Sequence, residues 1–234
     1  MKSKSIKIIL GSICLGMSFS AHSTLITNGF TFAVASSCSG GVQTATGTHF
    51  HSNTGGAFGN PAGLAEVGEF GGSACEEVRG LSEYNLTGLS AGPAFVTFDV
   101  FQPGGLFPGG NDFPFDGDIN VVAYQANNAE DVSDYQQTAV GSVGSFSTVG
   151  MAVGDVFSFD ITTILSNAIA SSWSSLGMRL EVSTTGSDPN GGAWVFNNFR
   201  LTSTDDTSNV PEPAILVLIS LSLAGIGYKR FTSV

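Results

Sequence analysis

Three aspartates, Asp112, Asp116 and Asp118, stand close together around a glycine in one short segment of the chain. Carboxylate oxygens at this spacing suit Ca²⁺, which takes roughly six to eight oxygen ligands. Asp131 and Asp134, in the next acidic segment, are further candidates. The pattern is not that of an EF-hand, because no bidentate glutamate follows at the required position. Aspartates beside glycine also build solvated turns, so a weak calcium site and a plain turn both stay open.

Three phenylalanines, Phe107, Phe113 and Phe115, belong to the same Gly- and Pro-rich segment. Aromatic rings stack on the apolar faces of sugars, so exposed rings beside these aspartates would form a platform for carbohydrate. Loop aromatics also pack beneath their own loop. The sequence leaves both interpretations open.

His49 and His51 alternate across Phe50, so within a strand their side chains face the same way. A His-x-His pair supplies two ligands to a metal ion, but no third ligand is near in the sequence. We therefore interpret this segment as a surface strand.

Several glutamates raise the question of glycoside chemistry, in which two carboxylates act as acid and base or nucleophile. The sequence gives no distance between these carboxylates, and we expect Glu76 and Glu77, beside Cys75, to form a solvated face. There is no Gly-x-Ser-x-Gly elbow, phosphate loop or dinucleotide fingerprint. We therefore predict a protein that is not an enzyme and requires no cofactor. The glutamates concerned are Glu66, Glu69, Glu76 and Glu77.

These residues must be positioned by short segments in which apolar and polar residues alternate. Clusters of Gly, Pro, Asn and Asp separate the segments. This pattern predicts a mainly β fold for residues 24–201, an antiparallel β-sandwich or jelly roll with one short helix. We place Trp173 and Trp194 in its core or at the seam between helix and sandwich. The segments expected as strands are 94–101, 119–124, 156–161, 176–182 and 194–201.

One helix is expected after the third of these segments. Ile164, Leu165, Ala168 and Ile169 would share one side of it, over an open end of the sandwich. Thr162 or Thr163 would cap its N-terminus.

The charge is unevenly distributed along the 234 residues. Residues 24–209 hold three arginines, no lysine and 18 of the 19 acidic residues, a net charge of −15. Nucleic-acid binding needs a basic footprint and is excluded. With 18 phenylalanines and no three-residue glycine period, the chain is neither wholly disordered nor collagen-like.

The N-terminal residues 1–23 have the pattern of a secretory signal peptide. Lys2, Lys4 and Lys7 precede an apolar run over 8–19, and Ala21-His22-Ser23 offers small residues for cleavage. An uncleaved membrane anchor is the alternative interpretation.

The C-terminal end follows a polar spacer at 202–209. The tetrapeptide Val210-Pro211-Glu212-Pro213 should be extended and exposed, because proline fixes its own φ and disfavours helix in the preceding residue. An almost wholly apolar run over 214–227 precedes Lys229 and Arg230. This run is shorter than the roughly 20 residues usual for a spanning helix, and we interpret it as a short stop-transfer segment.

Residues 210–234 resemble the PEP-CTERM sorting signal of Gram-negative bacteria, in the order Val-Pro-Glu-Pro, hydrophobic helix and basic cluster. The resemblance implies that exosortase, a membrane-embedded transpeptidase-like enzyme, recognises Pro211, Glu212 and Pro213 after Val210 and removes the tail. It also implies export to the cell surface or the exopolysaccharide matrix of biofilm-forming bacteria, after a transient stay in the membrane. The body is more weakly similar to jelly-roll domains of bacterial surface proteins and carbohydrate-binding modules, through Leu-Gly-x-Arg-Leu at 176–180 and Trp-x-Phe-x-Asn at 194–198.

Cys38 and Cys75 are left after Cys14 departs with the signal peptide. In an exported protein we expect them to form a disulfide, worth about 3–4 kcal/mol in the chain-entropy model. Two buried free thiols are the alternative.

These observations together predict an exported structural or adhesion protein of the cell surface or matrix, associated with exopolysaccharide and calcium. The rival is a secreted carbohydrate-binding or carbohydrate-active protein. A third interpretation is a protein kept in the inner membrane by an uncleaved tail.

Overall fold

The computed structural model describes residues 24–39, 42–51, 63–70, 76–106, 112–183 and 191–205, without the side chains at 38, 39 and 42. Several predictions lie outside these residues and stay predictions: the signal peptide, the sorting signal at 210–234, the Cys38–Cys75 disulfide and Phe107. Within the ranges that are described, no helix is both long enough and apolar enough to span a membrane.

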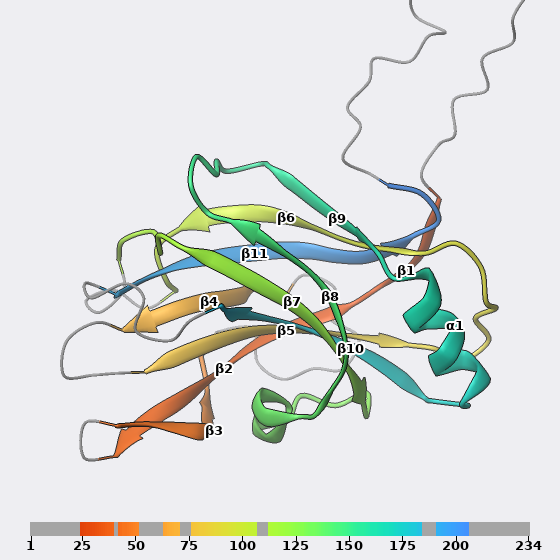
Figure 1. Ribbon diagram of the computed structural model, residues 1–234, viewed down its shortest axis with the longest axis horizontal. Helices are drawn as coiled ribbons and strands as arrows, with labels where there is room; N and C mark the ends of the chain where they lie inside the picture. The colour runs from red at the N-terminus through yellow and green to blue at the C-terminus, as the bar shows by residue number, and fades with distance from the viewer. Residues whose placement is uncertain are drawn as a thin grey trace, which may run out of the picture. The chain divides into compact units, whose positions relative to one another are not determined.

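The described residues are mainly β, as expected, and every strand pairing among them is antiparallel (Figure 1). The strands are β1 (Leu25–Asn28), β2 (Phe30–Ser39), β3 (Val42–Phe50), β4 (Ala65–Phe70), β5 (Glu77–Asn85), β6 (Phe95–Pro103), β7 (Asp118–Ala126), β8 (Ala139–Ser147), β9 (Val156–Asp160), β10 (Ser175–Val182) and β11 (Gly191–Thr202). The helical elements are the 3₁₀ helix η1 (Val132–Gln136) and the α-helix α1 (Thr162–Ala170).

The strands form one sheet in the order β8-β7-β10-β5-β4-β11-β6-β9, with β1 added on β11 and the β2–β3 hairpin on β5. The sheet curls until its two ends meet, and the fold is nearly a closed barrel. At that seam the ring of Phe146 from β8 stacks on Phe157 from β9, with centroids 4.1 Å apart. Glycine at position 144 of β8 allows this close packing, because a Cβ there would lie 2.6 Å from the ring of Phe159.

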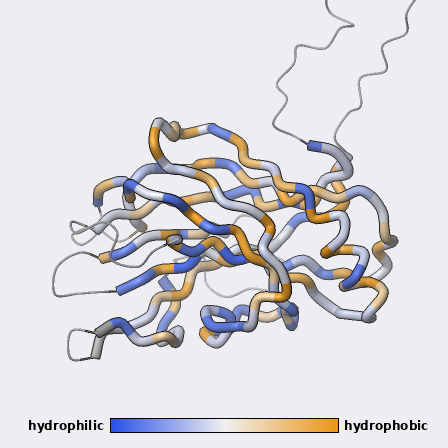
Figure 2. The backbone as a smooth tube through the Cα atoms, viewed as in Figure 1, coloured by the Kyte–Doolittle hydropathy of each residue, from blue (hydrophilic) through white to orange (hydrophobic). Residues whose placement is uncertain are grey.

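Hydrophobic and hydrophilic residues alternate along several strands (Figure 2), and the buried apolar side chains form two main clusters. One face of β7 and β10 carries Ile119, Val121, Leu176 and Met178, which belong to the large apolar core inside the curl. The opposite face of β5, β7 and β10 is covered by η1. There a smaller cluster contains Phe30, Phe32, Val34, Leu81, Tyr124, Ala126 and Tyr135.

The five segments expected as strands and the helix are confirmed, with small differences at their ends. The expected burial of Trp194 is also confirmed. The predicted threonine cap is wrong, because Ile161 occupies the N-cap position and makes no side-chain capping bond. Instead, Asp160 Oδ1 accepts a hydrogen bond from the Thr162 N–H at 2.8 Å, and Thr162 Oγ1 accepts one from the Ala94 N–H at 3.0 Å.

Candidate functional site

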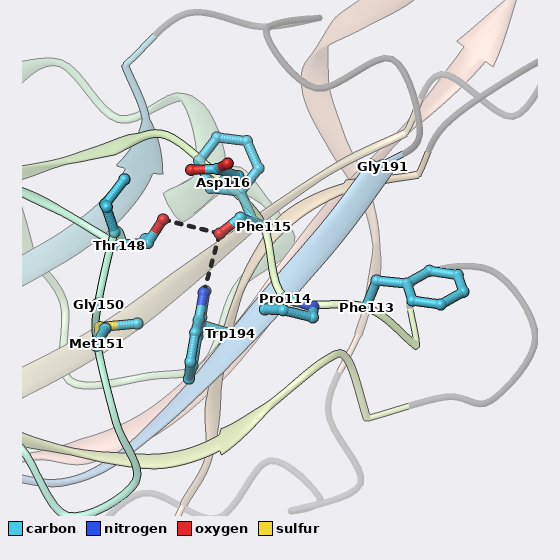
Figure 3. Close-up of a pocket in the computed structure, with 10 residues that line it drawn as sticks. Phe113, Pro114, Phe115, Asp116, Thr148, Gly150, Met151, Gly191 and Trp194 are labelled. Atoms are coloured by element: carbon cyan, nitrogen blue, oxygen red, sulfur yellow. Dashed lines mark hydrogen bonds between the residues drawn. The ribbon is translucent and has the colours of Figure 1, made fainter.

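An open pocket of about 880 Å³ lies where three segments meet: the loop before β7, the turn after β8 and the start of β11 (Figure 3). Among the described residues that line it, Asp116 is the one with a charged side chain, and the others are mostly apolar or contribute backbone. The lining residues are Phe113, Pro114, Phe115, Asp116, Thr148, Val149, Gly150, Met151, Gly191 and Trp194.

Hydrogen bonds fix the floor of this pocket. The Phe115 carbonyl oxygen accepts from Trp194 Nε1 at 3.0 Å and from Thr148 Oγ1 at 2.8 Å (Figure 3). The loop also pairs with β11 through the Ala193 N–H, which donates to the Phe113 carbonyl at 2.8 Å. A side chain at Gly192 would lie 2.8 Å from the Pro114 carbonyl oxygen, so glycine permits this close approach. The pocket wall is therefore held by backbone contacts on both sides.

The two described phenylalanines of this loop have different environments. Phe113 is 67% exposed and projects away from the other labelled side chains (Figure 3), whereas Phe115 is 1% exposed. Of the two interpretations that the sequence left open, packing beneath the loop holds for Phe115, whose side chain belongs to the large core and does not form an exposed platform. Of these two described rings, Phe113 is the one that a ligand can reach.

The three loop aspartates do not line the pocket together. Asp116 contributes to the wall, while Asp112 and Asp118 are exposed outside it. The further candidates serve other purposes, since Asp131 accepts from the Ser133 N–H to cap η1 and Asp134 is buried. As they stand, no three His, Cys, Asp or Glu side chains of the described residues are grouped to hold a metal ion. Calcium binding by this loop stays a prediction.

The histidines belong to a different cluster at the end of β3. His51 is buried, which corrects the expected surface position, and its Nδ1 lies 2.8 Å from Oε2 of the buried Glu66. Glu76 lies on the other side, with its carboxylate 3.7 Å from His51 Nε2 and 3.5 Å from Nε2 of the exposed His49. Burial raises the pKa of Glu76, and the two histidines partly offset this rise. The sequence did not indicate these partners because they come from other strands.

Glu77 was expected on a solvated face, and this is also wrong because its side chain is 2% exposed. Its carboxylate accepts hydrogen bonds from Arg79 Nε at 2.8 Å, Gln43 Nε2 at 2.7 Å and the Tyr135 hydroxyl at 2.8 Å. A carboxylate with three donors is held as a structural anion. Glu66 and Glu69 are likewise buried, whereas Glu76 is 18% exposed.

Among the described lining residues the charged group is the Asp116 carboxylate, which suits an uncharged, hydroxyl-bearing ligand better than an acidic one. The Thr148 hydroxyl is engaged with the Phe115 and Gly117 carbonyls.

Comparison with protein-family models found no matching family, and comparison with curated protein sequences found no match.

Proposed function

We propose that this chain is an exported surface or matrix protein of a Gram-negative bacterium, sorted by exosortase at its C-terminal signal and acting by structural association or adhesion. The observation that carries the proposal is the sequence order at the C-terminus: polar spacer, Val210-Pro211-Glu212-Pro213, apolar run and basic end. A signal peptide at the other end agrees with export. We assign the curled antiparallel sheet to the β-sandwich or jelly-roll class, which suits such a role.

The test is the intact mass of the exported chain in cells with and without exosortase. Cells with the enzyme should yield a product lacking the apolar tail, and cells without it should yield a chain that retains the tail. Glu212→Ala should block processing, while Ser208→Ala in the spacer should not. The same full-length mass in both strains would refute the sorting proposal and favour a retained membrane anchor.

A second candidate function is carbohydrate binding at the pocket. It is favoured by an exposed aromatic ring at the rim, Phe113, next to a carboxylate acceptor, Asp116. An aromatic ring and a hydrogen-bond acceptor together match the apolar face and the hydroxyl groups of a sugar. The described lining residues include an acidic side chain and no basic one, which favours a neutral polysaccharide over an acidic one.

This candidate is tested by glycan-array binding of the full chain, with calcium and with chelator. Phe113→Ala should weaken binding at least about tenfold, the loss expected when one stacking contact of roughly 1.4 kcal/mol is removed. The matched control is Phe101→Ala, an exposed ring that does not line the pocket. Equal loss in both variants, or no glycan bound, would count against the pocket. A melting temperature that does not rise with calcium would remove the calcium prediction.

A further inference from the structure

Two carboxyl groups from different elements lie together in the smaller interior region. Glu83 of β5 is 0% exposed and Asp134 of η1 is 1% exposed, beside an apolar cluster that includes Leu81 and Tyr135. The charge of the Glu83 carboxyl group acts on Asp134, which places the two carboxyl groups near each other. Two acids thus lie close together where water does not reach them.

The donors around the pair are neutral. Glu83 accepts from the Tyr124 hydroxyl at 3.2 Å, from the Asn128 N–H at 2.8 Å and from the Ser175 hydroxyl at 3.4 Å. Asp134 Oδ2 accepts from the Asp131 N–H at 3.2 Å. These bonds satisfy oxygen atoms but do not neutralise two negative charges.

The elements packed against the pair supply three other charged or titratable groups: Tyr124 from β7, Asp131 from the loop before η1, and Arg179 from β10. Asp131 is a further negative charge. Arg179 directs Nε to Glu181 at 2.8 Å and Nη1 to the main-chain oxygens of Asp134 and Gln137 at 3.2 and 2.9 Å. Among the described residues, therefore, no cation forms an ion pair with Glu83 or Asp134.

Two carboxylates cannot both ionise close together in such a site without a large cost, because burial and the like charge both oppose it. Burial raises the pKa of Asp134 to about 8, and the neighbouring Glu83 raises it as well. Burial also raises the pKa of Glu83, to about 6. The pair therefore shares a proton near neutral pH.

We propose that the Glu83–Asp134 pair is a proton-dependent clamp, which fastens η1 to the sheet while it holds a proton and releases η1 when both acids ionise. The released element would be the segment from Asn127 to Gln137.

This segment also supports the β2–β3 hairpin. Gln136 Oε1 accepts from the Gly47 N–H at 2.9 Å, and the Tyr135 hydroxyl accepts from Gln43 Nε2 at 3.3 Å. Release of η1 would remove both contacts and expose the apolar cluster beneath. Loss of the proton from the Glu83–Asp134 pair would therefore loosen the β2–β3 hairpin as well as η1.

The sign of the pH dependence follows from the raised pKa values. Between about pH 4, where free carboxyl groups titrate, and about pH 8, the folded chain binds more protons than the unfolded chain. The free energy of unfolding contributed by the pair is complete below this window and is lost as the pH rises through it.

The test is hydrogen–deuterium exchange of the full chain at pH 5 and pH 9, with each rate corrected for the intrinsic pH dependence of exchange. Amides of 127–137 should exchange at least about tenfold faster at pH 9, whereas amides of β11 should not change. Asp134→Asn has no titrating group at position 134, so two like charges cannot form there. The amides of 127–137 should therefore stay protected from exchange at pH 9 in this variant. Asp118→Asn, an exposed acid on β7, is the control and should behave as wild type.

Glu83→Gln provides a second variant if the first does not fold, and it should also keep η1 protected at pH 9. Carboxyl ¹³C titration of the wild-type chain measures the pair directly. The proposal fails if neither Glu83 nor Asp134 titrates above pH 6. It also fails if wild-type protection over 127–137 is the same at both pH values, or if a folded neutral variant loses protection as the wild type does.

Discussion

The seam between β8 and β9 and the region beneath η1 are both interior, yet they are held together in opposite ways. At the seam, Phe146 of β8 stacks on Phe157 of β9 at 4.1 Å, and Phe98 of the neighbouring β6 lies 5.8 Å from Phe157. Beneath η1, Glu77, Arg79 and their partners form a network of hydrogen bonds and ion pairs.

The difference follows from what covers the inner face and the outer face of the sheet. The inner face of the curl meets its own opposite wall and the buried side of α1, so apolar residues fill it. The outer face of β5 and β10 carries charged residues at alternate positions, as a solvated face would. Because η1 and the β2–β3 hairpin lie over this face, its charged groups are buried and must pair with one another.

The apolar seam should give the largest effect on stability. Phe98→Ala removes a fully buried ring that contacts five other rings, including Phe146 and Phe157, and should lower the free energy of unfolding by about 4 kcal/mol. Urea denaturation measures this loss. Phe101→Ala, an exposed ring on the same strand, should cost less than about 1 kcal/mol. A similar cost in both variants would show that the seam does not hold the curled sheet together.

The part of the seam formed by β6 and β9 was predictable from the sequence, whereas β8 was not among the segments expected as strands. Val96, Phe98 and Val100 alternate in one short segment, and Phe157 and Phe159 alternate in another. Period-two patterns of this kind identify strands with one apolar face. What they could not give is the strand order, because pairing of β6 with both β9 and β11 joins residues about 60 and 100 positions apart.

The polar region should give the next largest effect. Glu77→Ala leaves Arg79, Gln43 and the Tyr135 hydroxyl without their shared acceptor, and should lower the free energy of unfolding by about 3 kcal/mol. Glu77→Gln keeps an oxygen acceptor, so it should cost less in the same denaturation experiment. If Glu77→Ala is tolerated at under about 1 kcal/mol, the network beneath η1 is not a structural element.

The polar region and the pocket were poorly predicted, for a common physical reason. Charged residues alternating with apolar ones in β5 have the pattern of an exposed face, and only a distant element, η1, reverses that outcome. Phe113 and Phe115 likewise have the same type and nearly the same neighbours in sequence, yet one is exposed and the other buried. Local patterns set which residues share a face, whereas burial depends on which distant segment covers that face.

The smallest effect should come from the ion pair between Arg200 and Asp99, and it sharpens the comparison most directly. Its closest atoms are 2.8 Å apart, the same distance as between Arg79 and Glu77, but Asp99 is 25% exposed and Glu77 only 3%. A double-mutant cycle with Asp99→Asn and Arg200→Gln should give a coupling of at most about 1 kcal/mol, because water screens partly exposed charges. The coupling should shrink further in 1 M salt, where the Debye length is about 3 Å. The corresponding cycle with Arg79→Gln and Glu77→Gln should give a larger and less salt-dependent value. Equal couplings would mean that contact distance, rather than the element covering the face, decides what an ion pair contributes to this fold.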